Sequence, residues 1–101
     1  MSAVTLVNCF EVAPGREEEF LALWRQVNNY MRRKEGYLNH RLHRSLSPGA
    51  RYRFVNIAQW ASVEDFNAAH DHHFRAMVMK PEWAAFPSTP ALYDVADEAE
   101  A

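Results

Sequence analysis

The chain has 101 residues, of which 49% are hydrophobic and 24% are charged, and its formal net charge at pH 7 is −2. This composition predicts one ordinary globular domain and excludes a disordered chain. A basic surplus, which nucleic-acid binding proteins normally carry, is missing. Charged residues interrupt every apolar run well before about 18 residues, so we expect no membrane span and a cytoplasmic location.

The first predicted strand covers residues 3–12 and is mostly apolar on both faces. Alternation places Asn8 among large apolar side chains on one face and Cys9 on the other. Cys9 is the only cysteine, so no internal disulfide can form, and we expect it to be an inert core or interface residue.

A long helix is predicted over residues 16–34. Its acidic start, at residues 17–19, and its basic end, at residues 32–34, both suit the helix dipole. Gly36 follows as the expected stop signal. An apolar stripe at helical spacing comprises Phe20, Leu23, Trp24, Val27, Tyr30 and Met31.

A hairpin is predicted next, from strands over residues 37–45 and 51–60 joined by turn residues 47–50. The second strand, RYRFVNIAQW, carries one amide in the middle of a largely aromatic face. That face comprises Tyr52, Phe54, Asn56, Ala58 and Trp60. Burying an amide without a partner is costly, so Asn56 is expected either to bond a neighbouring backbone group or to face a ligand.

A second helix is predicted over residues 63–77, with Ser62 as its N-cap. On that helix Phe66, His70 and His73 share one face.

The remaining residues predict a helical turn over 82–86, a linker bracketed by Pro87 and Pro90, and a last strand over 91–96. A polar tail over 97–101 is expected to fray.

This order of elements, βαββαβ, predicts an α+β domain with the ferredoxin-like split βαβ pattern. We expect a single domain over residues 1–101, with its core in 3–96. Both helices should cover one face of the sheet, and the other face carries Val7, Cys9, Val55 and Ile57. An open apolar face marks an association surface, so a homodimer packed sheet against sheet is predicted.

The sequence VNIAQW followed by SVEDF, together with the pair Gly36 and Tyr37, resembles the antibiotic biosynthesis monooxygenase (ABM) family. The resemblance implies the dimeric α+β barrel of that family. Some members are cofactor-free oxygenases that convert aromatic anthrones to quinones in a pocket between helices and sheet. The resemblance places Asn56 and Trp60 in that pocket, with Tyr30 as the aromatic residue on the first helix. At Phe66 the chain departs from the anthrone oxygenases, which carry a tyrosine there.

A second branch of the family degrades haem, and the resemblance to it gives an alternative. Asn8 matches the asparagine that this branch carries on its first strand. Its second-helix tryptophan is replaced here by Ala69, and His70 and His73 lie only near the position of its histidine ligand. Haem is therefore the alternative cofactor, and no cofactor is the main expectation.

The expected chemistry is oxygenation by O2 of a flat aromatic or quinol-like molecule that first loses a proton. The expected catalytic residues are Asn56 and Trp60, which would orient the substrate and stabilise charge, and His70, which would move a proton. The expected substrate-binding residues are Asn8, Tyr30, Phe66 and His73. No metal site is predicted, because the histidines lack a third ligand at suitable spacing.

Two other interpretations stay open. The amides and the indole can be satisfied structural groups, and the histidines can be partly exposed structural residues. The domain would then be a non-catalytic dimer that binds a small molecule.

Overall fold

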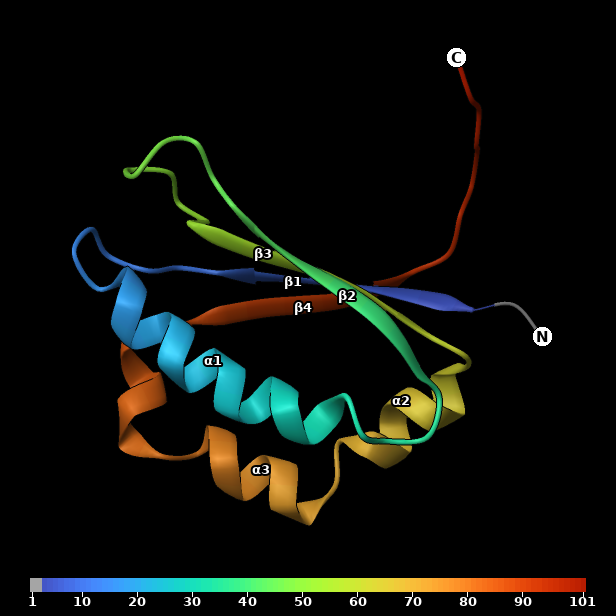
Figure 1. The fold of residues 1–101 in the computed structure, drawn as a ribbon, viewed down its shortest axis with the longest axis horizontal. Helices are drawn as coiled ribbons and strands as arrows, with labels where there is room; N and C mark the ends of the chain where they lie inside the picture. Colours follow the sequence, from blue (N-terminus) through green and yellow to red (C-terminus); the bar gives the residue numbers. More distant parts are fainter. Residues whose placement is uncertain (1–2) are drawn as a thin grey trace.

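The computed structural model of the protein describes residues 3–101, and it forms a four-stranded antiparallel sheet with helices packed along one face (Figure 1). The strands are β1 (Val4–Phe10), β2 (Tyr37–Arg44), β3 (Phe54–Trp60) and β4 (Ser88–Tyr93). The helices are α1 (Glu17–Met31), α2 (Val63–Ala69), α3 (His72–Val78) and the 3-10 turn η1 (Pro81–Ala85). The predicted ferredoxin-like α+β fold is confirmed.

The strands are ordered β2-β3-β1-β4, so β1 and β3 are central. Their antiparallel register places Asn8 directly opposite Asn56. Directly opposed side chains in an antiparallel pair lie about 5 Å apart at Cβ. The two amides therefore share the face of the sheet that the helices cover, which we call the inner face.

Strand β3 alternates as its sequence predicts. Asn56 and Trp60 on the inner face are buried, whereas Ile57 and Gln59 on the other face are exposed. The strand begins at Phe54 and not at the predicted residue 51, because residues 51–53 form a bend.

The single helix predicted over residues 63–77 is wrong. The chain forms two separate short helices here, α2 and α3, in place of one (Figure 1). Helix α2 ends at His70, and Asp71 starts a new helix because its side chain accepts a hydrogen bond from the backbone N–H of Phe74 at 2.9 Å. An aspartate in this position satisfies a helix N-terminus better than it fits a helix interior.

Two other predicted boundaries shift. Helix α1 ends at Met31, so Gly36 lies in the turn before β2, with a φ of 85°. Strand β4 begins at Ser88 and includes Pro90, which the sequence had placed in a linker. Proline is tolerated there because β4 is an edge strand and one side of it needs no donor.

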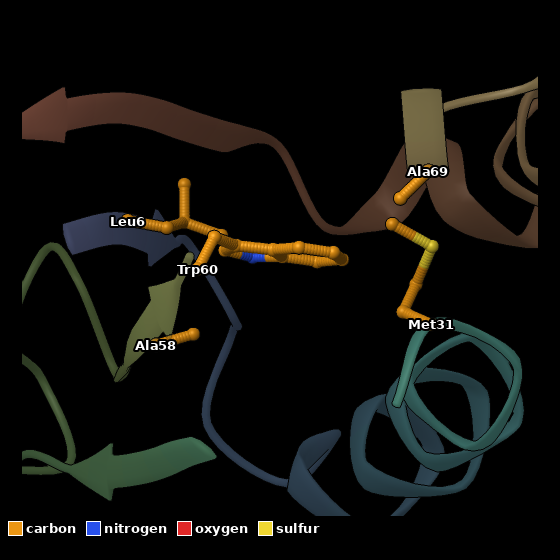
Figure 2. Close-up of a cluster of buried hydrophobic side chains, with 5 residues drawn as sticks. All are labelled: Leu6, Met31, Ala58, Trp60 and Ala69. Carbon is orange, nitrogen blue, oxygen red and sulfur yellow. The ribbon is translucent and has the colours of Figure 1, made fainter. Parts of the chain in front are cut away.

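The hydrophobic core is divided into two clusters along the inner face. One comprises Leu6, Met31, Ala58, Trp60 and Ala69. The other comprises Phe10, Val12, Phe20, Phe54 and Phe86. Figure 2 shows the first cluster, with the indole of Trp60 extending from the sheet toward Met31 of α1 and Ala69 of α2.

The Asn8–Asn56 pair occupies the row between these clusters. In the register of β1 and β3, the row on one side pairs Leu6 with Ala58. The row on the other side pairs Phe10 with Phe54. The amides therefore interrupt the apolar inner face at its middle.

The opposite face of the sheet, which we call the outer face, has no helix over it (Figure 1). It carries Val7 and Cys9 from β1 beside Ile57 and Val55 from β3. Ile57 is 39% exposed, which is high for a central-strand isoleucine. The apolar patch that the sequence predicts is therefore at the centre of the outer face, and the neighbouring β2 positions on that face are the polar residues Asn39, Arg41 and His43.

Candidate active site

A cavity of about 570 Å³ lies between the inner face of the sheet and the helices. Its walls are aromatic and aliphatic side chains together with a few neutral polar groups. Among the described residues that line it, none is Lys, Arg, Asp or Glu. All three tryptophans of the chain, Trp24, Trp60 and Trp83, are in the lining. Such a cavity suits a flat, largely apolar molecule.

Three buried polar atoms on the sheet wall of this cavity have no hydrogen-bond partner: Oδ1 of Asn8, Oδ1 of Asn56 and Nε1 of Trp60. Asn56 is 6% exposed and Trp60 is 2% exposed. Leaving a buried polar group unpaired costs about 1–3 kcal/mol, and native proteins keep few such groups. A ligand with hydroxyl and carbonyl groups would pair these atoms, because the two Oδ1 atoms accept from a ligand hydroxyl and the indole N–H donates to a ligand oxygen.

His70 lies on the cavity wall at the end of α2. Its Nδ1 is 2.6 Å from the backbone carbonyl oxygen of Phe66. A carbonyl oxygen only accepts, so Nδ1 carries a proton and Nε2 of the neutral ring carries the lone pair. The rings of Phe66 and Phe74 hold the imidazole, with centroids 4.1 and 4.5 Å away. In its neutral form His70 therefore presents Nε2 as its lone-pair nitrogen, which is the arrangement that a general base requires.

The sequence-predicted residues Tyr30 and His73 are not among those that line the cavity. The hydroxyl of Tyr30 donates to Oδ2 of Asp71 at 2.6 Å, and Nζ of Lys34 donates to the same oxygen at 2.7 Å. The ring of His73 packs on that of Tyr30, with centroids 4.6 Å apart. The break between α2 and α3 explains the difference, because it removes His73 from the face that Phe66 and His70 share.

Two polar residues of the cavity were missed by the sequence reasoning. Asn28 on α1 is 9% exposed, and Tyr37 begins β2; both line the cavity. The hydroxyl of Tyr37 contacts Nδ1 of His40, and Nδ2 of Asn28 is 3.3 Å from the same nitrogen. The spacing of Asn28, four residues after Trp24 and three before Met31, is the signal that would have revealed it.

Burial shifts two pKa values in this group. It raises the pKa of Tyr37 above the ordinary 10.0, although a hydrogen bond with Asn28 partly opposes the shift. It lowers the pKa of His40 below the ordinary 6.5, and the nearby positive charge of Arg32 lowers it further. His40 is therefore neutral at pH 7, and Tyr37 keeps its proton.

The sequence matches the model of the antibiotic biosynthesis monooxygenase family over residues 3–86. The chain belongs to this family. The crystal structure of a candidate monooxygenase from Shewanella loihica PV-4 is similar at 32% identity, with a TM-score of 0.84 over 96% of this chain and 97% of that one. No curated protein matches the sequence.

Two more distant structures share the fold of this ABM-family chain. SnoaB, a cofactor-independent oxygenase from Streptomyces nogalater, is 24% identical with a TM-score of 0.78, over 97% of each chain. A dabb family protein with a ferredoxin-like fold from Mesorhizobium loti is 13% identical, with a TM-score of 0.72 over 96% of this chain and all (100%) of that one.

Residues 3–101 of the ABM-family chain were considered for a metal site and for a membrane-spanning helix. No group of three or more His, Cys, Asp or Glu side chains in that range is placed to hold a metal ion. None of the helices in the same range combines the length and the hydropathy needed to cross a membrane.

Proposed function

We propose that this protein is a cofactor-independent monooxygenase that oxidises a flat aromatic or quinol-like molecule with O2 in the cavity. The observation that carries the proposal is the set of unpaired buried atoms on Asn8, Asn56 and Trp60, on the wall of a cavity lined by uncharged residues. Membership of the ABM family and the likeness to the fold of a cofactor-independent oxygenase support the same reaction class.

The aromatic walls would hold the ring system of the substrate. The ring of Trp60 has Phe66 at its edge, with centroids 5.8 Å apart and an interplanar angle of 89°, so its position is fixed by packing. The amides of Asn8 and Asn56 would pair with oxygen substituents of the substrate. Because Asn56 and Trp60 are buried, hydrogen bonds from these groups would be stronger than in solution.

The proposed reaction converts a methylene group between two aromatic rings to a ketone. One methylene and one O2 give one carbonyl and one water, so no external reductant is required. His70 Nε2 would take the first proton, and the electron-rich carbanion would then react with O2 to give a peroxide. The N–H groups of Asn56 and Trp60 would stabilise the developing oxyanion. Loss of the second hydrogen with cleavage of the O–O bond would give the ketone and water.

The roles of Tyr30 and His73 are not part of this proposal, because neither residue lines the cavity. Phe66 contributes a ring and no hydroxyl, so the proton transfers must involve other residues.

We also propose that the protein is a homodimer joined through the outer face of the sheet. The apolar side chains of Val7, Val55 and Ile57 on that face support it, since an exposed apolar sheet face marks an association surface. The contact would bury Cys9, the only cysteine of the chain.

The haem alternative fits the cavity poorly. Haem carries two propionate groups, and the described cavity lining offers no Lys or Arg to pair with them. The position expected to carry a tryptophan in the haem-degrading branch is Ala69, which is buried in the core. We therefore derive no step through haem.

Oxygen uptake with an anthrone, which carries the methylene group that the proposed reaction requires, tests the proposed function. We expect Asn56→Ala to lower kcat/KM by about 100-fold, in line with the loss of one oxyanion donor. Trp60→Phe keeps the ring and removes the N–H donor, so it should lower kcat more than it raises KM. Asn67→Ala is the matched control, because Asn67 is exposed on α2 and does not line the cavity.

Tryptophan fluorescence separates a binding protein from an enzyme, since Trp24, Trp60 and Trp83 all line the cavity. Quenching by the aromatic ligand without oxygen uptake would identify the non-catalytic binding dimer. Equal uptake by the wild-type protein, Asn56→Ala and Trp60→Phe would refute the assigned roles.

A further inference from the structure

A second polar group, separate from the sheet amides and from His70, lies at the β2 side of the cavity. It consists of Asn28 from α1 and of Tyr37 and His40 from β2. Asn28 and Tyr37 line the cavity, whereas His40 does not. His40 is only partly buried, on a strand at the edge of the sheet. The group thus extends from the cavity wall to the edge strand β2.

The hydrogen bonds of this group define the direction in which a proton can move. Nδ2 of Asn28 approaches Nδ1 of His40 at 3.3 Å, and an amide nitrogen only donates. Nδ1 of His40 therefore presents its lone pair, and the proton of the neutral ring is on Nε2. The hydroxyl of Tyr37 is 3.5 Å from Oδ1 of Asn28 and contacts this Nδ1 more closely. With Nδ1 unprotonated, the hydroxyl is a donor to His40.

Packing fixes the positions of the two rings. Tyr37 meets the indole of Trp60 edge to face, with centroids 5.2 Å apart and an interplanar angle of 83°. Trp24 meets His40 in the same way at 5.2 Å. The register pairs Tyr37 with Trp60, which already carries one of the unpaired polar atoms of the cavity. A ligand on Trp60 would therefore also meet Tyr37, which lines the same cavity.

We infer that Tyr37 and His40 form a proton-transfer dyad that binds a ring hydroxyl of the ligand and removes its proton. The inference rests on the proposed function for its role in catalysis. The proton of the ligand hydroxyl passes to Oη of Tyr37 as the proton of Tyr37 passes to Nδ1 of His40. The ligand becomes a phenolate and His40 becomes an imidazolium, so the total charge is unchanged.

The dyad deepens the proposed function in two ways. It specifies a substrate with a phenolic or enolic hydroxyl, and ionising that hydroxyl raises the electron density that reaction with O2 requires. It also supplies the cavity with a phenol group, which Phe66 does not. Its charge state agrees with this role, since burial keeps His40 neutral and able to accept a proton.

The charged group that acts on His40 is Arg32, the C-cap residue of α1, whose positive charge disfavours the imidazolium. The side chain opposite His40 on β3 is Ala58, which is uncharged. The imidazolium is therefore held by the negative charge of the adjacent phenolate, and its proton returns to the peroxide or to the product when that charge is lost.

Alizarin, a flat dihydroxyanthraquinone whose neutral and ionised forms differ in colour, tests the dyad without turnover, because it is already a quinone. We expect the ratio of ionised to neutral alizarin to be about tenfold higher when bound than in the same buffer, which corresponds to one unit of pKa. Tyr37→Phe and His40→Gln should return the ratio to its solution value while tryptophan quenching still reports binding.

Matched controls are Tyr93→Phe and His43→Gln, because Tyr93 is 54% exposed and neither residue lines the cavity. Nitrogen NMR of His40 is a second measurement, and it should show an unprotonated Nδ1 near pH 7 whose shift changes in Tyr37→Phe. An unchanged alizarin ratio in Tyr37→Phe, or a protonated Nδ1, would overturn the dyad.

Oxygen uptake keeps this result distinct from the proposed function. Uptake with an anthrone by a protein that leaves bound alizarin neutral would reject the dyad and leave the monooxygenase in place. Ionised alizarin without uptake of oxygen would retain the dyad as a ligand-ionising site and reject the monooxygenase. Failure of alizarin to quench tryptophan fluorescence, together with no oxygen uptake with an anthrone, would reject both.

Discussion

Replacing Gly36 with alanine is expected to destabilise the fold strongly, and Gly15 offers a matched control. Both glycines have a positive φ, 85° at Gly36 and 90° at Gly15. A Cβ added at Gly36 would lie 2.4 Å from Cβ and Oδ2 of Asp65 in α2, whereas a Cβ at Gly15 would meet nothing within 4 Å. The two substitutions thus share the backbone strain and differ in the steric clash.

The magnitude follows from these two effects. A left-handed backbone costs an alanine about 1–2 kcal/mol, and the loss of freedom in the unfolded chain returns about 0.4–1 kcal/mol, so Gly15→Ala should cost about 1 kcal/mol. Overpacking adds about 1–3 kcal/mol, so Gly36→Ala should cost about 2–4 kcal/mol. At about 4–8 °C for each kcal/mol in a domain of this size, the Tm of Gly36→Ala should be at least about 5 °C below that of Gly15→Ala.

Urea and thermal denaturation followed by circular dichroism, at one protein concentration, measure both variants. Adding Asp65→Gly to Gly36→Ala removes the Cβ that causes the clash and should recover part of the lost stability. Equal destabilisation of the two alanine variants, or no recovery in the double variant, would show that the contact between the β2 turn and α2 is not tight.

Three further predictions concern other parts of the fold. Hydrogen bonds from Lys34 first, then from Tyr30 and the backbone of Phe74, hold the pKa of Asp71 below its ordinary 3.8, so its stabilisation is present above pH 3.8 and lost below it. The Tm of Asp71→Asn should therefore fall less steeply on acidification than that of the wild-type protein; parallel curves would refute this. Phe20→Ala should cost about 3–5 kcal/mol in urea denaturation, because Phe20 is 0% exposed among three other phenylalanines, and a cost under about 1 kcal/mol would contradict this packing. Ile57→Lys on the outer face should give monomers in light scattering, whereas the control Val63→Lys on α2 should not; a dimeric Ile57→Lys would argue against the sheet-to-sheet contact.

The sheet and its inner face were predictable because successive side chains of a strand must point to opposite faces of the sheet. Once Phe54, Ala58 and Trp60 required burial, Asn56 had to lie beside them. The element order βαββαβ predicts that β1 and β3 are neighbours, whereas the register that places Asn8 directly opposite Asn56 comes from the structure.

The helical wall of the cavity was less predictable. The break after Ala69 depends on Asp71, whose side chain caps α3 and also bonds Tyr30 and Lys34 from a distant helix. Helical periodicity cannot anticipate such long-range contacts. The prediction of one continuous helix therefore assigned His73 to the cavity. Tyr37 was missed for a different reason, because it had served only as part of a family signature.

The division of the hydrophobic core bears on how this protein can be redesigned. The amide row of Asn8 and Asn56 separates two apolar clusters, and Val78 lines the cavity without belonging to either. A substitution at Val78 would change the shape of the cavity that a ligand meets and would leave both apolar clusters intact. The molecule is therefore suited to laboratory evolution, in which ligand preference is varied while thermal tolerance is retained.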